Sequence, residues 1–351
     1  MSSKPRIGYV PFSRDLGKPG DRRRFVAYAQ RRNLKFEIAA AGETYDLLVL
    51  SQSADVSLWV DYRGGKVVYD LIDSYLAIPR SDLKQLLRAP AKYVVGQFKH
   101  LRFDYKGLVQ DMCRRADAVI CTTEEQQRCI EQYCANVHMA LDFHSSVARQ
   151  HKTDYSVAQT IRIVWEGLGV NVSHLALLKD VLRSVAASTD LTLVVVTDIQ
   201  YFRWLNKIGR VRTEDVVQRL FQPVSVHAWN EDSCASIVCS CDIGVIPLDL
   251  TDPFVAGKPE NKLLLMWRMG MPVVSSATPA YARAMNAAGT PALACRSADD
   301  WLKALRTLVA DEEARRAAGT AGREFANQAW GEAALLARWD RAMASIGIEV
   351  K

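Results

Sequence analysis

The chain has 351 residues, of which 49% are hydrophobic, so it is long and apolar enough to build two domain cores. Its formal net charge is +6, and residues 1–12 contain no apolar run typical of a secretory signal. No segment approaches the roughly 18 apolar residues that a membrane-spanning helix needs. The eight cysteines form no repeated Cys-x-x-Cys pair, which argues against a disulfide framework or a zinc site and indicates a reducing, cytoplasmic compartment.

Short β-branched runs alternate with helical patterns through the first half of the chain. Helices are predicted at 21–33 and 124–134. Six strands are predicted at RIGYVPF (6–12), KFEIAA (35–40), DLLVLS (46–51), KVVYDLI (66–72), AVICTT (118–123) and VHMAL (137–141).

The same alternation restarts after a polar stretch without a clear period. A helix is predicted at 172–187, with further helices between the later strands and from residue 297 onwards. Strands are predicted at IRIVWEG (161–167), LTLVVVTD (191–198), VSVHAW (224–229), DIGVIPL (242–248), PVVSS (272–276) and PALAC (291–295). We therefore predict an α/β protein with two doubly wound, Rossmann-like domains at 1–145 and 161–330, a linker at 146–160 and a helical tail at 331–351.

Ligands of such sheets bind outside the carboxyl ends of the strands, so the loops there are the candidate sites. Gly167 and Gly169 form a lone G-x-G, without the third glycine of a dinucleotide fingerprint. The stretch GKPENKLLLMWRMGMPVV (257–274) offers another way to hold phosphate. A helix that begins near Asn261 has free backbone N–H groups, and with Lys258 and Lys262 it would attract an anion. The alternative is that both lysines are ordinary solvated side chains.

Residues 224–289 resemble the donor-binding half of GT-B glycosyltransferases, especially family 4. The resemblance rests on DIGVIP (242–247) and on KLLLMWRMGMPVV (262–274). It implies two domains facing across a cleft, an acceptor site in the N-terminal domain, a nucleotide-sugar donor as substrate in the C-terminal domain, and a C-terminal helix that crosses back to the first domain. It implies no cofactor and no bound metal.

By position, the resemblance places Lys262 and the amides of Asn261 and Lys262 at the donor diphosphate. Gly167 and Gly169 would let the backbone approach the sugar phosphate, and Trp229 would lie near the nucleobase; the alternative for Trp229 is a core aromatic at a strand end.

One departure from the family pattern concerns the ribose. Many family members have a glutamate at the position of Leu265, and a second acidic residue where this chain has Gly257. Leucine cannot accept a hydrogen bond, so Asn261, one helical turn earlier, or Glu260 would have to bind the ribose hydroxyls.

Sugar transfer needs a base for the acceptor hydroxyl, or a donor phosphate that plays that part. Asp73 follows a predicted strand and is the first candidate; Asp70 lies within that strand, on its opposite face, and is the second. Glu166 ends a strand of the second domain and would hold the sugar or stabilise positive charge. Both Asp73 and Glu166 could instead cap the turns that follow them.

Residues 79–115 contain nine basic and three acidic residues, equal to the whole net excess of the chain. The apolar residues from 91 to 109 recur every three or four positions. This pattern predicts a helix that packs its apolar face on the sheet and exposes its lysines. A second interpretation is contact with an anionic membrane surface. Aromatic residues are not arranged as stacking platforms, so nucleic acid is not an expected partner.

These observations predict a metal-independent glycosyltransferase that moves a sugar from a nucleotide-sugar to a glycan or lipid-linked acceptor. It would act in cell-surface polysaccharide or glycoconjugate synthesis, in the cytoplasm or on the inner face of the plasma membrane. Two alternatives remain open at this point. One is a catalytically silent nucleotide-sugar-binding or partner protein, and the other is a nucleotide-sugar epimerase.

Overall fold

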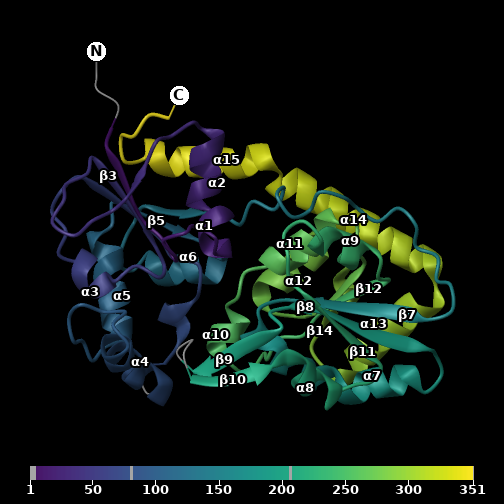
Figure 1. The fold of residues 1–351 in the computed structure, drawn as a ribbon. Coiled ribbons are helices and arrows are strands. Elements are labelled where there is room, and N and C mark those ends of the chain that lie inside the picture. Colours follow the sequence, from purple (N-terminus) through teal and green to yellow (C-terminus); the bar gives the residue numbers. More distant parts are fainter. Residues whose placement is uncertain (1–4, 80–81, 205–207, 351) are drawn as a thin grey trace. The chain divides into compact units, whose positions relative to one another are not determined.

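A computed structural model describes residues 5–79, 82–204 and 208–350. The chain divides into two compact units (Figure 1). Unit 1 comprises Met1–Phe143, Gly257–Pro259 and Glu332–Lys351, and unit 2 comprises His144–Ala256 and Glu260–Gly331.

Unit 1 contains a six-stranded parallel sheet in the order β2-β1-β3-β4-β5-β6. Its central strands are continuous apolar runs, because helices cover both faces of a parallel sheet. The strands are β1 (Ile7–Val10), β2 (Glu37–Ile38), β3 (Leu47–Ser51), β4 (Lys66–Asp70), β5 (Ala118–Cys121) and β6 (Val137–Met139). The helices are α1 (Pro19–Arg22), α2 (Phe25–Arg31), α3 (Val56–Trp59), η1 (Tyr75–Ala77), α4 (Leu83–Val94), α5 (Tyr105–Arg115), α6 (Glu124–Ile130) and α15 (Glu332–Ala344).

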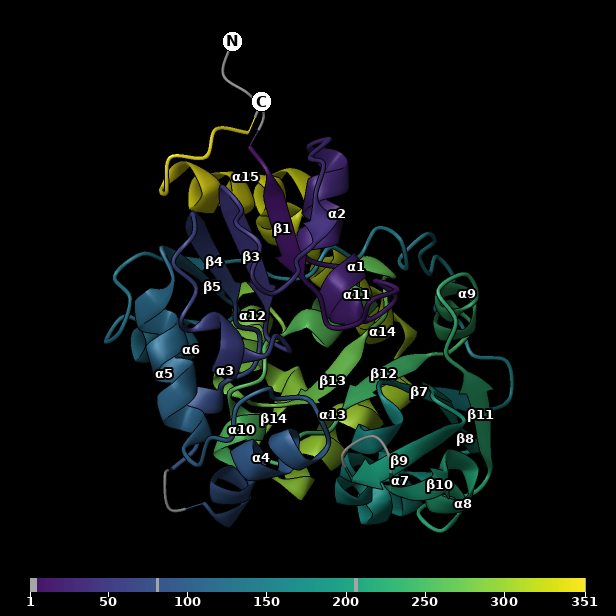
Figure 2. The same ribbon diagram turned by 60° about the vertical axis from the view of Figure 1, so that its left-hand side comes forward.

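The C-terminal helix α15 belongs to unit 1 although it comes from the far end of the chain. Trp339 is fully buried and stacks on Tyr28 of α2, with ring centroids 5.2 Å apart. Arg32 and Tyr28 both donate hydrogen bonds to Asp340. Figures 1 and 2 show α15 beside α2 in both views. This apolar and ionic contact fixes the tail on the first sheet.

Unit 2 contains a second six-stranded parallel sheet in the order β11-β8-β7-β12-β13-β14. Its strands are β7 (Ile161–Glu166), β8 (Leu191–Thr197), β11 (Val224–Ala228), β12 (Ile243–Ile246), β13 (Val273–Ser276) and β14 (Ala294–Cys295). An antiparallel hairpin of β9 (Gln200–Trp204) and β10 (Ile208–Arg212) forms a separate two-stranded sheet. The helices are η2 (Gly169–Leu178), α7 (Lys179–Ala186), α8 (Thr213–Gln218), α9 (Cys234–Cys239), α10 (Pro253–Ala256), α11 (Asn261–Arg268), α12 (Pro279–Ala287), η3 (Pro291–Leu293), α13 (Ala298–Ala310) and α14 (Glu312–Trp330).

The predicted fold class is confirmed: both sheets are parallel, helices alternate with their strands, and the C-terminal part is helical. Several element predictions were wrong in detail. The helix predicted at 21–33 is broken between α1 and α2, because the backbone turns at Arg24 and sends its side chain into the core. The first part of the helix predicted at 172–187 is the 3-10 segment η2, and a 3-10 turn replaces most of the strand predicted at 291–295.

Two larger differences concern segments predicted as helix. The region between β8 and β11 begins with the β9–β10 hairpin, and only then forms the short helix α8. The segment 91–109 is interrupted, since α4 ends at Val94 and α5 begins at Tyr105, with Asp104 as its N-cap. A loop therefore replaces the middle of the predicted basic helix.

Candidate functional site

The sheet of unit 2 reverses its strand order between β7 and β12. From β7 the chain builds outward through β8 and β11, and it then returns to add β12, β13 and β14 on the other side. The chain therefore leaves β7 and β12 towards opposite sides of the sheet at its carboxyl edge. In open α/β sheets this is where ligands bind. Glu166 ends β7, and the chain that leaves β12 leads to α11.

Helix α11 begins at this edge, and its apolar residues explain its position. Leu263, Leu264, Met266 and Trp267 are fully buried and anchor the helix in the core of unit 2. Glu260 is the N-cap residue, and its side chain makes no capping hydrogen bond to the helix. The first turn carries no acidic residue, so the carboxylate at the helix start is that of the N-cap residue Glu260.

The ammonium group of Lys262 lies against the end of β7. Its Nζ donates a hydrogen bond to the backbone oxygen of Glu166 over 3.1 Å and lies 5.0 Å from the centre of the Trp165 ring. A Cβ added to Gly167 would come within 2.3 Å of the same Nζ and 2.9 Å of the Trp165 ring. A glycine at position 167 is thus what lets the lysine approach the strand end. Gly167 and Lys262, predicted to share a site, are neighbours.

Two buried carboxylates act on a tyrosine of the same unit. Glu166 and Glu260 are 7% and 9% exposed, and both act on the phenol of Tyr281 in α12. Burial, reinforced by the charges of these two carboxylates, raises the pKa of Tyr281 far above its ordinary value. The phenol therefore stays protonated at physiological pH. This edge combines a cation and a helix start, which can bind an anionic group, with carboxylates that can accept hydrogen bonds from hydroxyls.

Gly169 opens the segment that follows β7. Its amide donates a 2.9 Å hydrogen bond to the carboxylate of Asp198, at the end of β8, and a Cβ there would come within 2.8 Å of the Tyr201 ring. Asp198 and Tyr201 were not predicted as site residues. Tyr201 lies on the β9–β10 hairpin, which the sequence pattern did not reveal. The sequence did offer one signal for Asp198, since it is a polar residue directly after a predicted strand.

The remaining predicted residues of unit 2 lie on the same edge. Trp229 follows β11, the edge strand, and its amide donates to the backbone oxygen of Thr197 over 2.9 Å. Its side chain is half-buried, as is that of Asn261. Leu265, at the position of the family glutamate, is 1% exposed and belongs to the core. The ribose-binding role that was assigned to Asn261 or Glu260 stays a prediction.

Asp73 and Lys258 belong to unit 1. Asp73 follows β4 and is half-buried; Gln52 donates to its carboxylate over 2.6 Å and accepts from its backbone amide. Lys258 lies in the short segment 257–259, where the backbone oxygen of Gly257 accepts a hydrogen bond from Ser74 over 2.8 Å. The sequence therefore placed its candidate residues at the edges of two sheets, and within unit 2 the structure brings Lys262 against Gly167 and the backbone of Glu166.

Asp70 is a structural residue. It is 1% exposed and accepts two hydrogen bonds, at 2.6 and 2.7 Å, from the fully buried guanidinium of Arg24. Arg24 also binds Asp142, at 3.2 Å. A carboxylate held in this way has no access to an acceptor hydroxyl.

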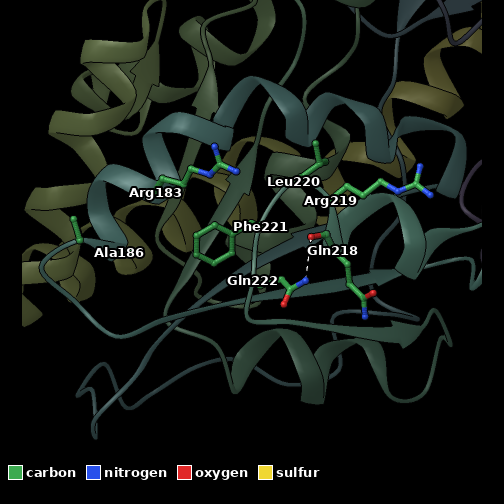
Figure 3. A pocket seen from close by; sticks show the side chains of 8 residues that line it. Arg183, Ala186, Gln218, Arg219, Leu220, Phe221 and Gln222 are labelled. Carbon is green, nitrogen blue, oxygen red and sulfur yellow. Dashed lines mark hydrogen bonds between the residues drawn. The ribbon is translucent and has the colours of Figure 1, made fainter.

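A surface hollow of about 440 Å³ lies elsewhere on unit 2, between α7, α8 and the loop before β11 (Figure 3). Its lining includes Arg183, Arg219 and Phe221. The loop Phe221–Pro223 leads into the start of β11, so the hollow lies at the amino edge of the sheet, and no predicted site residue lines it. Within the described residues, no three His, Cys, Asp or Glu side chains are grouped closely enough to hold a metal ion.

No protein-family model and no curated protein matches the chain. Solved structures do. Sucrose-phosphate synthase from Thermosynechococcus elongatus has a TM-score of 0.59 at 13% identity, over 92% of this chain and 76% of that one. A glycosyltransferase from Rickettsia africae has a TM-score of 0.58 at 9% identity, over 99% of this chain and 100% of that one. The chain has the GT-B fold. A third GT-B structure, from E. coli and described as trehalose-6-phosphate bound with UDP-2-fluoro glucose, has a TM-score of 0.51 at 10% identity, over 93% of this chain and 78% of that one. These likenesses extend to the GT-B fold and not to family 4.

Proposed function

We propose that this GT-B protein is a glycosyltransferase that moves a sugar from a nucleotide-sugar donor to a glycan or lipid-linked acceptor. The observation that carries the proposal is the contact of Lys262 with the end of β7 at the switch point of unit 2. A lysine and a helix start are what a diphosphate needs at such a sheet edge. One fold relative is described as a glycosyltransferase, and another is described as bound with UDP-2-fluoro glucose.

In the proposed reaction the acceptor hydroxyl attacks the anomeric carbon, and the bond from that carbon to the diphosphate oxygen breaks. The nucleoside diphosphate leaves with the electron pair. Lys262 and the amides at the start of α11 would stabilise the charge that develops on it. The acceptor proton goes to Asp73 or to the leaving phosphate. Glu166 would hold the sugar or stabilise positive charge at its ring. Because charged side chains and amides do this work, the reaction is proposed to need no metal.

The binding step is tested with a thermal-shift panel of UDP, GDP, dTDP and CMP with their sugars. We expect one nucleotide class to raise the melting temperature, and Lys262→Met to weaken its binding by about 10- to 100-fold, the size of a lost charge-assisted hydrogen bond. Lys303→Met, at an exposed position of α13, is the matched control and should bind like the wild type. If no nucleotide shifts the wild type, the donor site is refuted.

The second candidate function is a nucleotide-sugar-binding protein without catalytic activity. It is favoured by the buried Leu265, which stands where many glycosyltransferases of family 4 have a ribose-binding glutamate. Donor turnover separates the two. A transferase consumes the donor faster when an acceptor is added, whereas a silent binder shows the thermal shift without turnover.

The same proposal covers the location and the process. The protein would act on the cytoplasmic face of the plasma membrane, in the synthesis of cell-surface polysaccharides or glycoconjugates. The support is the basic excess of residues 79–115, which would attract an anionic membrane.

A further inference from the structure

Two basic side chains of helix α4 pack against aromatic rings of unit 1. The guanidinium of Arg88 lies 4.8 Å from the ring centre of Tyr75, and the ammonium of Lys92, one turn later, lies 5.0 Å from Phe98 and 4.9 Å from Tyr105. Partial burial, followed by the charge of Arg88, lowers the pKa of Lys92 to about 8. Cations held over aromatic faces at this range are attracted to them. Arg88 and Lys92 therefore attach this helix to η1 and α5.

The apolar side chains of the same region face solvent instead. Leu87 and Val94, seven positions apart and so on one face of α4, are 59% and 82% exposed. In the loop that follows, Leu101 is 47% exposed and Phe103 70%, while Tyr93 at the end of the helix is 43% exposed. The predicted packing of 91–109 therefore holds in part. Phe98, Tyr105 and Leu108 are buried and Lys99 and Arg102 are exposed, as predicted, whereas Val94 and Leu101 are exposed and Lys92 packs inward. Five exposed large apolar side chains within residues 87–103 indicate an interaction surface.

The charged residues of the segment itself have one sign. Residues 87–103 contain four basic residues and no acidic residue. Of the four, Lys99 and Arg102 are exposed; Arg102 lies 4.0 Å from Asp61. In Figures 1 and 2, α4 lies at the end of unit 1 opposite to α15. The segment is thus a terminal surface of unit 1 with apolar side chains and a positive rim.

We propose that residues 87–103 form a docking surface for an anionic lipid bilayer. Leu87, Val94 and Phe103 would enter the boundary between headgroups and acyl chains. Lys99 and Arg102 would lie at the level of the lipid phosphates. No described helix is both long enough and apolar enough to cross a bilayer, so the contact is interfacial. This inference rests on the proposed function for its purpose, since a membrane-bound enzyme would meet lipid-linked acceptors.

Charge decides between a bilayer and a second copy of the chain. A two-fold contact places the same patch on both partners, so the positive rim of one copy would face that of the other. The segment has no acidic residue to neutralise this charge, and Asp61 lies beside Arg102 of its own copy. An anionic bilayer satisfies the apolar side chains and the cations together.

The test is sedimentation with vesicles of phosphatidylcholine alone or with about 30% phosphatidylglycerol, at low and high salt. We expect the wild type to bind only the anionic vesicles, and less at high salt. Val94→Ser/Phe103→Ser should lower binding at least about tenfold, from the lost apolar burial. Lys99→Gln/Arg102→Gln should lower it by about tenfold at low salt and remove most of the salt dependence. Lys35→Gln/Ile38→Ser changes an exposed basic and an exposed apolar residue elsewhere on unit 1 and should bind like the wild type.

Three outcomes would overturn the proposal. They are no binding by the wild type, equal binding by the Val94→Ser/Phe103→Ser variant, and a dimer in solution that this variant dissociates. The assay contains no donor. If a nucleotide raises the melting temperature but the protein does not bind vesicles, the docking surface is refuted and the proposed function stands. If the protein binds vesicles but no nucleotide raises its melting temperature, only the donor site is refuted.

Discussion

The two sheets have six parallel strands each and a comparable reversal of strand order, yet their carboxyl edges use charged side chains differently. At the edge of unit 1, Arg24 forms ion pairs with Asp70 and Asp142, and Gln52 donates a hydrogen bond to Asp73. At the edge of unit 2, Lys262 donates to the backbone oxygen of Glu166 and lies over the Trp165 ring. The first arrangement stabilises a fold, whereas the second places a cation at a strand end beside the start of a helix.

The largest expected effect concerns the buried ion pairs of unit 1. Arg24→Met leaves the carboxylates of Asp70 and Asp142 buried without their cation, which should lower the free energy of unfolding by about 3–5 kcal/mol. Arg128→Met, at an exposed i,i+4 pair, should cost less than about 1 kcal/mol. Urea unfolding measures both. Equal losses would refute the view that this edge is structural.

The same variant has a predictable pH dependence. Burial already raises the pKa of Asp142 in the folded protein. Without Arg24 that pKa rises further, so the folded state binds its proton more tightly than the unfolded state. Stability from such a group is present at low pH and lost as the pH rises. The destabilisation by Arg24→Met should therefore be smaller near about pH 4 than at pH 7, as urea midpoints will show.

Asp73→Asn tests whether the edge of unit 1 also has a catalytic group. If Asp73 is the base, turnover should fall by about 100-fold or more, with nucleotide binding unchanged. Asparagine can still pair with Gln52, so the fold should be retained. Asp61→Asn, at an exposed site, should leave turnover unaffected. Turnover within a few-fold of the wild type would assign the proton to the donor phosphate instead.

Gly167→Ala tests the edge of unit 2 without removing its charge. The added methyl group would displace the Lys262 ammonium and crowd the Trp165 ring. Moving an unchanged cation away from the diphosphate should weaken nucleotide binding by about tenfold, at a stability cost of about 1–3 kcal/mol. Gly289→Ala would not be a matched control, because its backbone is left-handed. Gly17→Ala is suitable, since a Cβ there makes only ordinary contacts. Binding equal to that of the wild type would contradict a diphosphate at Lys262.

The strands could be predicted from the sequence because buried parallel strands are continuous apolar runs, as in β3 and β8. The edge positions of Glu166, Gly167 and Lys262 followed from where these runs end. The β9–β10 hairpin was missed since its place depends on packing against η2, not on a local pattern. The helix predicted from 91 to 109 was right for the burial of Phe98, Tyr105 and Leu108, and wrong for Val94 and Leu101, which are exposed. A loop between α4 and α5 breaks the period, and periodicity cannot tell that the ammonium of Lys92 packs over the ring of Tyr105.

The smallest expected effect separates the nucleobase from the diphosphate. Strand β11, which Trp229 follows, lies two strand spacings from β7, or about 10 Å, the scale of the separation between base and diphosphate in a nucleotide. Trp229→Ala should weaken nucleoside diphosphate binding by about five- to tenfold, the lower end of a stacking contact, and leave inorganic pyrophosphate binding unchanged. Lys262→Met should weaken both ligands. Titration of each variant with both ligands resolves the edge into two subsites. If Trp229→Ala weakens pyrophosphate as strongly as nucleotide, the indole is a structural residue of the strand end, and the base must be bound elsewhere.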